Sequence, residues 1–374
     1  MNVTRRHALI GAAAAAACAP RLFAAGPNSL DTVAGRKGLR FGSAVGMGQF
    51  PDERYRALVE AECGVIVPEN ELKMHAIHPL GPDQFDFTRA DTLVDYATRH
   101  GLKVRGHNLI WHHPKWMPKW SETLDYGPRP ADRVAEILTN HINTVCKRYA
   151  DRIYTWDVVN EAVDNNNGVM RETAFSKAMG SPEAVLDLAF HTARAAVPDC
   201  ELVYNDYMNW DTAAHMGGVL HLLDGFRKRN VPVDTLGLQS HLSARPGIAR
   251  GGFGPDQEKA WRGFLDAVTG MGYRLQITEY DVNDAAIPGD FAARDAAVAD
   301  LTRAYLDCTL SYREVSVVMV WGMTDRYSWL QHSQNRRPDG QPLRCCPYDA
   351  DFKPHPMREA IAASLAGARS RSRT

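Results

Sequence analysis

From about residue 38 onward, short apolar stretches alternate with longer segments in which apolar residues recur every three or four positions. The short stretches are rich in β-branched and aromatic residues, as buried parallel strands are, and the longer segments have the period of amphipathic helices. The predicted strands span residues 39–45, 64–68, 103–109, 153–159, 201–205, 235–239, 274–278 and 315–321. A helix is predicted after each strand, over residues 53–62, 89–100, 131–149, 183–196, 212–229, 256–269, 291–311 and 357–366.

Eight strand–helix units in one run predict an α/β fold, the (β/α)8 TIM barrel. The alternative is a doubly wound sheet, but that fold would be expected to carry a glycine-rich phosphate-binding turn after its first strand, and the sequence has none there. The chain shows no internal repeat, linker or block of charge. A single catalytic domain over residues 26–370 therefore accounts for the whole pattern.

Polar and aromatic residues follow seven of the eight predicted strands, at the ends where active sites of this fold gather. Each alone has an ordinary explanation: Glu69 and Lys73 could form a surface ion pair on a helix, and His107 or His241 could be a hydrogen-bonded core histidine. Together they converge on one mouth of the barrel, where burying so many unrelated polar groups would be costly. The sequence therefore predicts a functional site at this mouth.

Two of these strands end in a glutamate. Residues 152–161 form an apolar strand pattern that ends in Asn160 and Glu161, and residues 274–281 carry Glu279 near their end. Because successive strand residues point to opposite faces, Asn160 and Glu161 can serve one pocket only if the chain leaves its regular pleat there. A pair of carboxylates on separate strand ends is what cleavage of a glycosidic bond requires, one to protonate the leaving oxygen and one to meet the anomeric carbon.

The sixth and seventh strand ends are neighbours in such a barrel, and Asp281 lies two residues beyond Glu279, on the same side of its strand. Asp281 is therefore expected to orient His241, which in turn donates to Glu279 and keeps it ionised. The alternative is that Asp281 only caps a loop.

Aromatic side chains near the same mouth suit sugar rings, whose C–H faces pack against π systems. They are Trp111, Trp116, Trp120, Tyr207, Trp321 and Trp329. Several could instead fill the core, as Trp156 is expected to do from inside a strand.

A group of histidines also lies close together in the sequence, at positions His75, His78, His107, His112 and His113. Their spacing repeats none of the known zinc-ligand patterns, so no catalytic metal and no cofactor are expected.

The 374-residue chain has a formal net charge of -1 and 45% hydrophobic residues, which suits a large buried core and does not suggest a nucleic-acid partner.

Residues 1–25 predict a twin-arginine-type export signal, because Arg5 and Arg6 precede an alanine-rich run and a small-residue cleavage site. The alternative is an alanine-rich first helix, and Cys18 is a weak candidate for a lipoprotein anchor. Apolar runs after residue 25 are too short to span a bilayer. An exported monomer, periplasmic or secreted, with no membrane contact after signal removal is expected.

Six cysteines follow Cys18, and they have no metal-ligand spacing. Cys63, Cys146 and Cys308 are expected to be small buried hydrophobic residues. Disulfides cannot be paired from the sequence, and the adjacent pair Cys345-Cys346 has no explanation at this level.

The ordered motifs resemble those of the glycoside hydrolase family ten endo-1,4-β-xylanases, retaining (β/α)8 enzymes, from about Phe41 to Ala360. The resemblance rests on the segments 68–73, 105–112, 156–161, 237–242, 277–281 and 320–322. It implies that Glu161 is the acid/base, that Glu279 is the nucleophile, and that xylan and xylo-oligosaccharides are the substrates. It also implies that the sugar subsites are lined by Glu69, Asn70, Lys73, His107, Trp111, Asn160, Gln239, His241, Trp321 and Trp329.

The resemblance further implies a cis peptide bond between His107 and Asn108. The chain departs from the family at His75, where a tryptophan is usual, and at His113-Pro114, where Ser-Gln is frequent. Two alternatives stay open: hydrolysis of another β-1,4-glucan such as cellulose, and a barrel that binds β-glycans without cleaving them.

Overall fold

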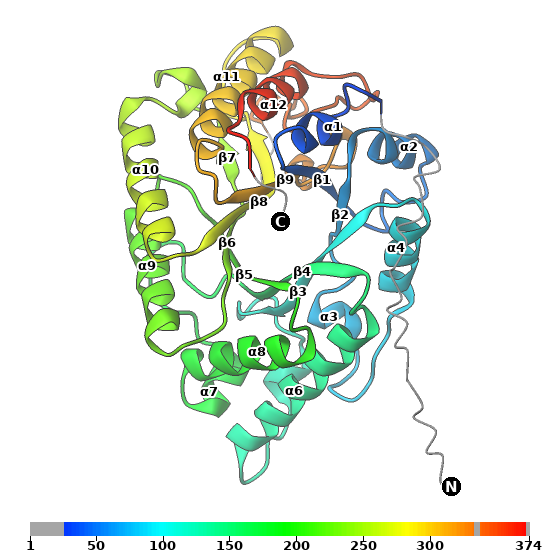
Figure 1. Ribbon diagram of the computed structural model, residues 1–374, viewed down its shortest axis with the longest axis vertical. Coiled ribbons are helices and arrows are strands. Elements are labelled where there is room, and N and C mark those ends of the chain that lie inside the picture. Colours follow the sequence, from blue (N-terminus) through cyan, green and yellow to red (C-terminus); the bar gives the residue numbers. More distant parts are fainter. Residues whose placement is uncertain (1–25, 333–336, 372–374) are drawn as a thin grey trace, which may run out of the picture.

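Parallel strands close into a barrel in the computed structural model, which describes residues 26–332 and 337–371 (Figure 1). The pairings run in the order β6-β5-β4-β3-β2-β1-β9-β8, and a parallel pairing of β6 with β8 closes the ring. The strands are β1 (Arg40–Val45), β2 (Val65–Pro68), β3 (Lys103–Trp111), β4 (Ile153–Asn160), β5 (Glu201–Asp206), β6 (Thr235–Leu238), β8 (Arg274–Asn283) and β9 (Val315–Val320). The predicted barrel is therefore confirmed, and the export signal predicted at residues 1–25 lies outside the described residues.

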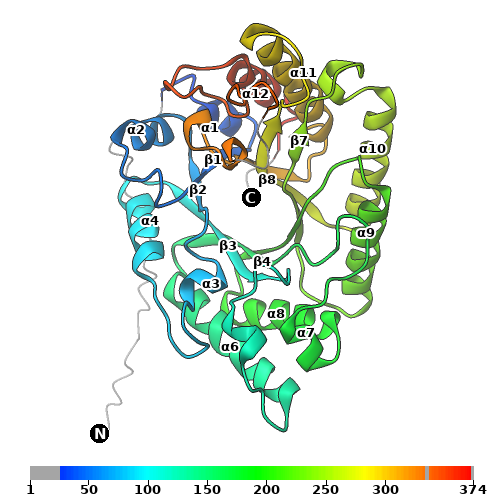
Figure 2. The same cartoon turned by 180° about the vertical axis from the view of Figure 1, so that it is seen from behind.

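Helices surround the barrel on its outer side, as the opposite views of Figures 1 and 2 show. The eight predicted helices are present as α2 (Glu53–Glu62), α4 (Thr88–Arg99), α6 (Pro130–Arg148), α8 (Pro182–Ala196), α9 (Ala213–Lys228), α10 (Pro255–Gly270), α11 (Phe291–Thr309) and α12 (Pro356–Gly367). Four of them begin on a proline that the prediction left one residue outside. Proline suits the first turn because its missing N–H is one that a helix start leaves unpaired in any case.

Short elements that the sequence pattern did not predict connect these units. They are the helices α1 (Leu30–Gly35), α3 (Met74–Ile77), α5 (Trp120–Thr123) and α7 (Ala174–Met179), the 3-10 turns η1 (Arg250–Gly252), η2 (Asp325–Tyr327) and η3 (Trp329–Gln331), and the strand β7 (His241–Ser243). The strand β7 pairs with the end of β8, which runs five residues beyond its predicted end. This pairing sets His241 beside Asp281, so it matters for the site described below.

The core inside and around the barrel has the expected apolar composition, and Trp156 on β4 is fully buried in it, as predicted. Gly106 on β3 faces that ring, and a Cβ added there would lie 2.2 Å from the Trp156 ring. The glycine of the Arg105-Gly106-His107 motif is thus needed for close packing. Cys63, Cys146 and Cys308 are buried, as predicted, and so are the other described cysteines.

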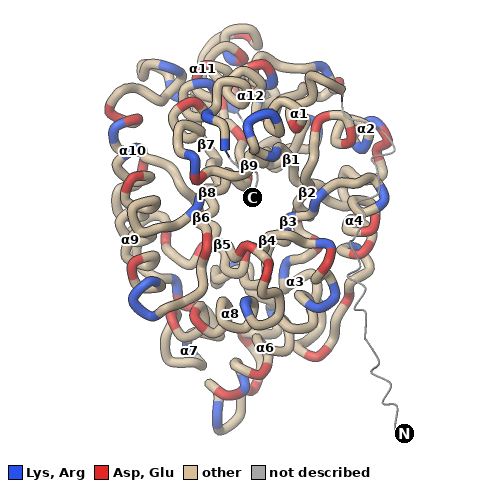
Figure 3. Tube along the Cα trace, viewed as in Figure 1, with Lys and Arg blue, Asp and Glu red and all other residues tan. Residues whose placement is uncertain are grey.

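Acidic and basic residues are interspersed over the surface helices and loops, as Figure 3 shows, in keeping with the formal net charge of -1. Over residues 26–332 and 337–371, the helices are all too short or too polar to cross a membrane.

Candidate active site

The backbone leaves its regular pleat at the end of β4, which was the condition for Asn160 and Glu161 to serve one pocket. Glu161 has a φ of 56°, in the left-handed region that residues with a side chain seldom adopt, and its N–H donates to the Asn205 carbonyl at 2.9 Å. The turn brings two successive side chains to one place, because Asn160 Nδ2 donates to Glu161 Oε1 at 3.1 Å. Backbone strain of this kind is frequent at functional sites, and here it brings the side chains of Asn160 and Glu161 together.

Glu161 is buried and is held by uncharged donors. Trp111 Nε1 donates to its Oε2 at 2.8 Å, and Gln239 Nε2 donates to its Oε1 at 2.9 Å. Burial raises the pKa of Glu161 to about 7, and the nearby negative charges of Asp206 and Glu279 act in the same direction. The two hydrogen bonds favour the ionised form but do not outweigh burial. A carboxyl group with this pKa can hold a proton near neutral pH and give it up to a leaving group.

Glu279, near the end of β8, is equally inaccessible but has charged neighbours. Asn205 Nδ2 donates to its Oε1 at 2.7 Å, and His241 Nε2 lies 3.2 Å from its Oε2. Burial alone would raise the pKa of Glu279, but the hydrogen bond from His241 and the nearby positive charges, Lys73 among them, bring it down to about 2. Glu279 is therefore ionised over the whole neutral and mildly acidic range.

His241 lies between two carboxylates, in the arrangement predicted from the neighbouring strand ends. Its Nδ1 donates to Asp281 Oδ1 at 2.8 Å, while its Nε2 faces Glu279. Burial disfavours a charged imidazole, yet Asp281 and Glu279 together raise the pKa of His241 to about 10. Asp281 also accepts a hydrogen bond from Trp329 Nε1 at 2.7 Å, so it does more than cap a loop.

A second buried network joins His107, a predicted site residue, to Arg105 and Asp157, and these contacts were not predicted. Arg105 makes a two-pronged ion pair with Asp157, and His107 Nδ1 donates to Asp157 Oδ2 at 2.7 Å. His107 Nδ1 also lies 4.0 Å from Glu279 Oε1, which places the histidine at the floor of the site. The peptide bond from His107 to Asn108 is cis, as the family resemblance implied.

The loops after β1 and β2 form one wall of the mouth. Lys73 is buried, and its Nζ donates to Asn70 Oδ1 at 3.0 Å and lies 4.4 Å from the centre of the Trp111 ring. Glu69 accepts a hydrogen bond from Gln49 Nε2 at 2.9 Å, so the surface ion pair of Glu69 with Lys73, the ordinary explanation considered for them, is not what the structure shows.

A cavity of about 360 Å³ opens between this wall and the loop after β9. Glu69, Asn70 and Trp329 are among the residues that line it. A larger hollow of about 740 Å³ lies at the opposite end of the barrel, where the strands begin, and it is lined by Arg40, Glu201 and other residues outside the predicted site. The smaller cavity is therefore the one at the predicted mouth of the barrel, because three predicted site residues line it and none lines the larger hollow.

The predicted aromatic residues form two groups, one beside His107 and His241 and one around Trp111. The Trp321 ring centre lies 5.3 Å from that of His107, the Trp329 centre 5.1 Å from that of His241, and the Tyr207 centre 6.4 Å from that of His241. Trp116 stacks at 4.9 Å on Trp111, the residue that donates to Glu161, and leaves 39% of its own surface exposed.

Trp120 differs from this group and corrects the prediction. Its Nε1 donates to the His78 carbonyl, and its ring packs near Phe175, so its contacts are those of a core residue. The clustered histidines also separate in space: His78 pairs with His141 at 2.9 Å, and His112 Nε2 lies 3.0 Å from the Arg171 carbonyl.

Among residues that sequence reasoning passed over, Asn205 is the most informative. Its amide donates to both Asn160 Oδ1 and Glu279 Oε1, at 2.8 and 2.7 Å, and so joins the two strand ends that carry the glutamates. Its position at the tip of the fifth predicted strand was the available signal. Asp157 gave a weaker signal, a lone carboxylate inside an apolar strand.

Three comparisons with known proteins agree with this geometry. The family profile described as "Glycosyl hydrolase family 10" matches residues 29–364. The chain is 32% identical over 341 residues to "Endo-1,4-beta-xylanase 3" of Hypocrea jecorina, covering 90% of this chain and 86% of that protein. It is 30% identical over 304 residues to "Endo-1,4-beta-xylanase B" of Thermotoga neapolitana, covering 80% of this chain and 82% of the other. A crystal structure of xylanase 10B from Thermotoga petrophila in complex with xylobiose superposes with a TM-score of 0.78 and 28% identity, covering 91% of this chain and 97% of that one.

Proposed function

The chain belongs to glycosyl hydrolase family 10, and from this membership we propose that it is an endo-acting β-1,4-xylanase that cleaves with retention of configuration. The observation that carries the proposal is the pair of buried glutamates whose pKa values lie apart, near 7 for Glu161 and near 2 for Glu279. A retaining hydrolase needs one carboxyl group that is protonated and another that is ionised at the same pH.

In the first step, the Glu279 carboxylate attacks the anomeric carbon, and the glycosidic C–O bond breaks. Glu161 gives its proton to the departing oxygen, so the leaving sugar departs as an alcohol. In the second step, Glu161 takes a proton from water, the water oxygen attacks the same carbon, and Glu279 is released as a carboxylate. Both configurational inversions occur at one carbon, so the product retains the β configuration.

The remaining predicted side chains are proposed to bind and position the sugar. Buried polar groups are worth most where they meet hydroxyl groups that an incorrect substrate lacks. The proposed set is Glu69, Asn70, Lys73, His107, Trp111, Asn160, Tyr207, Gln239, His241, Trp321 and Trp329. The contacts among Lys73, Asn70 and Trp111 support it, because they hold three of these side chains together before any sugar arrives.

The choice of xylan over cellulose is proposed to depend on steric exclusion. Xylose lacks the hydroxymethyl group that glucose carries at C5, so a wall can close over a xylose ring where a glucan site must leave room. Trp321 and Trp329 are large enough to form that wall, and the Trp329 indole is held by its hydrogen bond to Asp281. Exclusion of this kind is worth about 1 to 3 kcal/mol, or roughly 10- to 200-fold in specificity.

Export through a twin-arginine signal is proposed on the sequence of residues 1–25. A full-length Arg5→Lys, Arg6→Lys variant should accumulate inside the cell, with the xylanase activity of the cell exterior falling accordingly. Unchanged export of that variant would remove this part of the proposal. Neither a nucleic-acid partner nor an oligomer is proposed, because the charge is balanced and the proposed site is assembled from one chain.

One assay tests the activity: release of reducing ends from xylan and from cellulose by the purified chain and by a Glu279→Ala variant. We expect the purified chain to act on xylan and not on cellulose. The Glu279→Ala variant should lose this activity, whereas Glu136→Gln, on the exposed face of α6, should keep it. Equal or greater activity on cellulose would support the glucan alternative, and binding to xylan without release would support the non-catalytic one. Proton NMR of the first product should show the β anomer, and an α anomer would contradict retention.

A further inference from the structure

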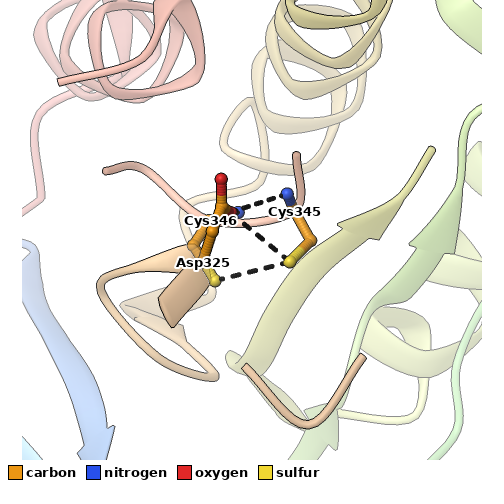
Figure 4. Close-up of side chains that lie close together, drawn as sticks. All are labelled: Asp325, Cys345 and Cys346. Carbon is orange, nitrogen blue, oxygen red and sulfur yellow. Dashed lines mark hydrogen bonds between the residues drawn. The ribbon is translucent and has the colours of Figure 1, made fainter. Parts of the chain in front are cut away.

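Two adjacent cysteines turn their sulfur atoms toward the same carboxylate (Figure 4). Cys345 and Cys346 lie in the segment that follows the loop after β9, and both are buried, as is Asp325 at the start of η2. The two Sγ atoms are 3.8 Å apart, and Cys345 Sγ lies 3.5 Å from Asp325 Oδ1. One ligand atom from each residue lies within 4.8 Å of the others.

These distances match the edges of a metal-centred tetrahedron. A zinc ion with bonds of about 2.3 Å to sulfur and about 2.0 Å to oxygen separates two sulfur ligands by about 3.8 Å and a sulfur from an oxygen by about 3.5 Å. We propose that Cys345, Cys346 and Asp325 form a structural site for a zinc-like divalent cation, apart from the catalytic glutamates.

A second observation points to the same place. Asp325 Oδ2 forms an ion pair with His355 Nε2 at 3.1 Å, but neither atom makes a hydrogen bond within residues 26–332 and 337–371. Both residues are more than nine-tenths buried, at 4% and 3% exposure. Polar atoms this deep are normally hydrogen-bonded, so a carboxylate oxygen that makes ion pairs but no hydrogen bond, beside two sulfur atoms, can still bind a cation.

The surrounding backbone holds the carboxylate in place. Asp325 Oδ1 accepts the N–H groups of both Cys345 and Cys346 at 2.9 Å, so the three proposed ligands are fixed relative to one another. Hydrogen bonds of this kind orient ligands around metals in proteins. Cys345 and Cys346 release their two thiol protons to solvent as two sulfur–metal bonds form, and no group is oxidised or reduced.

A disulfide between the adjacent cysteines is the main alternative. It would need the sulfur atoms to approach to about 2.05 Å, whereas they stand 3.8 Å apart, at the separation of two ligands on one metal. Two thiolates beside a carboxylate suit zinc better than magnesium or calcium, which prefer oxygen ligands alone.

The site would stabilise the loop that carries Trp329. Leu330 and Leu343 pack with the two cysteines, with Trp329 against the same cluster. Gln331 Oε1 accepts the N–H of Leu343 at 3.0 Å, which joins the two segments on either side of the metal ligands. A bound cation would add a second connection between these segments and hold the wall of the sugar site from behind.

Because the ligands are buried, the metal must be supplied while the chain folds. The full-length chain would be produced in medium containing Co²⁺, purified, and examined by absorption spectroscopy and elemental analysis. One cobalt per chain with a thiolate-to-cobalt charge-transfer band is expected. Cys345→Ala and Cys346→Ala should each lose the band, while Cys308→Ala, a buried cysteine on α11, should keep it.

Thermal unfolding provides an independent measurement on protein made with Zn²⁺. The melting temperature of the wild type and of Cys308→Ala should fall when the metal is removed by unfolding in chelator and refolding, and that of Cys345→Ala should not change. A wild type without the cobalt band refutes the proposal, since that result needs no variant to fold. So does a mass loss equal to two thiol hydrogens, which would identify the disulfide instead.

Discussion

Replacing Asp281 with asparagine tests whether Asp281, acting through His241, lowers the pKa of Glu279. The carboxylate accepts hydrogen bonds from His241 Nδ1 at 2.8 Å and from Trp329 Nε1 at 2.7 Å. Asparagine has nearly the same shape but carries no charge, and its amide has only one oxygen for the two donors. The substitution therefore removes the main reason for His241 to remain protonated while leaving the packing almost unchanged.

The magnitude follows from the pKa of Glu279, which falls from 4.5 to about 2. That lowering corresponds to about 3 kcal/mol of preference for the ionised form. The hydrogen bond from His241 is its leading favourable cause, and a hydrogen bond to a charged group is worth about 1.5 to 3 kcal/mol. Loss of the imidazolium should raise the pKa of Glu279 by about one to two units.

The direction of the effect on rate is set by which form is active. In the proposed mechanism Glu279 must be ionised to attack, so activity is lost as the pH falls through the pKa of Glu279. A higher pKa moves that loss to less acidic solution. The acid limb of kcat/KM for an aryl xylobioside should thus move upward by about one to two pH units in Asp281→Asn. The alkaline limb, which depends on Glu161, should move little.

Trp329→Phe is the matched control, because it removes the indole N–H that Asp281 accepts but leaves His241 beside both carboxylates. Its acid limb should stay where the wild-type limb lies. An Asp281→Asn protein that folds normally and keeps the wild-type acid limb would show that Asp281 does not set the charge on His241.

Three further predictions concern the proposed acid/base Glu161, the sugar selectivity set by Trp329, and the packing of Gly106 against Trp156. Glu161→Gln should lower kcat by about 10²- to 10⁴-fold and remove the alkaline limb near pH 7, since that limb is the loss of the Glu161 proton as the pH rises; a retained limb assigns it elsewhere. Trp329→Ala should lower the ratio of kcat/KM for xylobiosides to kcat/KM for cellobiosides, by up to roughly 200-fold. An unchanged ratio would show that Trp329 does not exclude the hydroxymethyl group of glucose. Gly106→Ala should lower the free energy of unfolding in urea by about 1 to 3 kcal/mol, because its methyl group would meet Trp156. Gly217→Ala, on the exposed side of α9 with open space around it, should instead raise it by up to about 1 kcal/mol.

The elements with a strong local signal could be predicted from the sequence. The helix α2 has the predicted bounds, Glu53–Glu62, because an aspartate caps its start and an apolar strand follows soon after its end. The starts of α6, α8, α10 and α12 were missed by one residue because each begins on a proline, which breaks helices elsewhere. The strand β7 was missed because three residues are too few to show a period, and its pairing depends on the end of β8.

Contacts between distant positions explain what the sequence could not show at the site. Arg105 donates to Gln276, 171 residues later in the chain, and to Asp157 on a third strand. Each of these residues occupies an ordinary position in its own strand, and only the closed barrel brings them together. The separation of Asp325 from Cys345 by 20 residues hides that cluster in the same way.

The different roles proposed for the two glutamates follow from the charge of their partners and not from their depth. Glu161 and Glu279 are 3% and 5% exposed, so burial disfavours the ionised form of each to a similar degree. Glu161 meets an indole and amides, which are neutral donors, and its pKa rises to about 7. Glu279 meets His241, which is itself charged because Asp281 stands behind it, and its pKa falls to about 2. In the proposed mechanism, Asp281 thus contributes through His241 to the choice of which glutamate attacks and which holds the proton, and the positive charges of His107 and Lys73 act on Glu279 in the same direction.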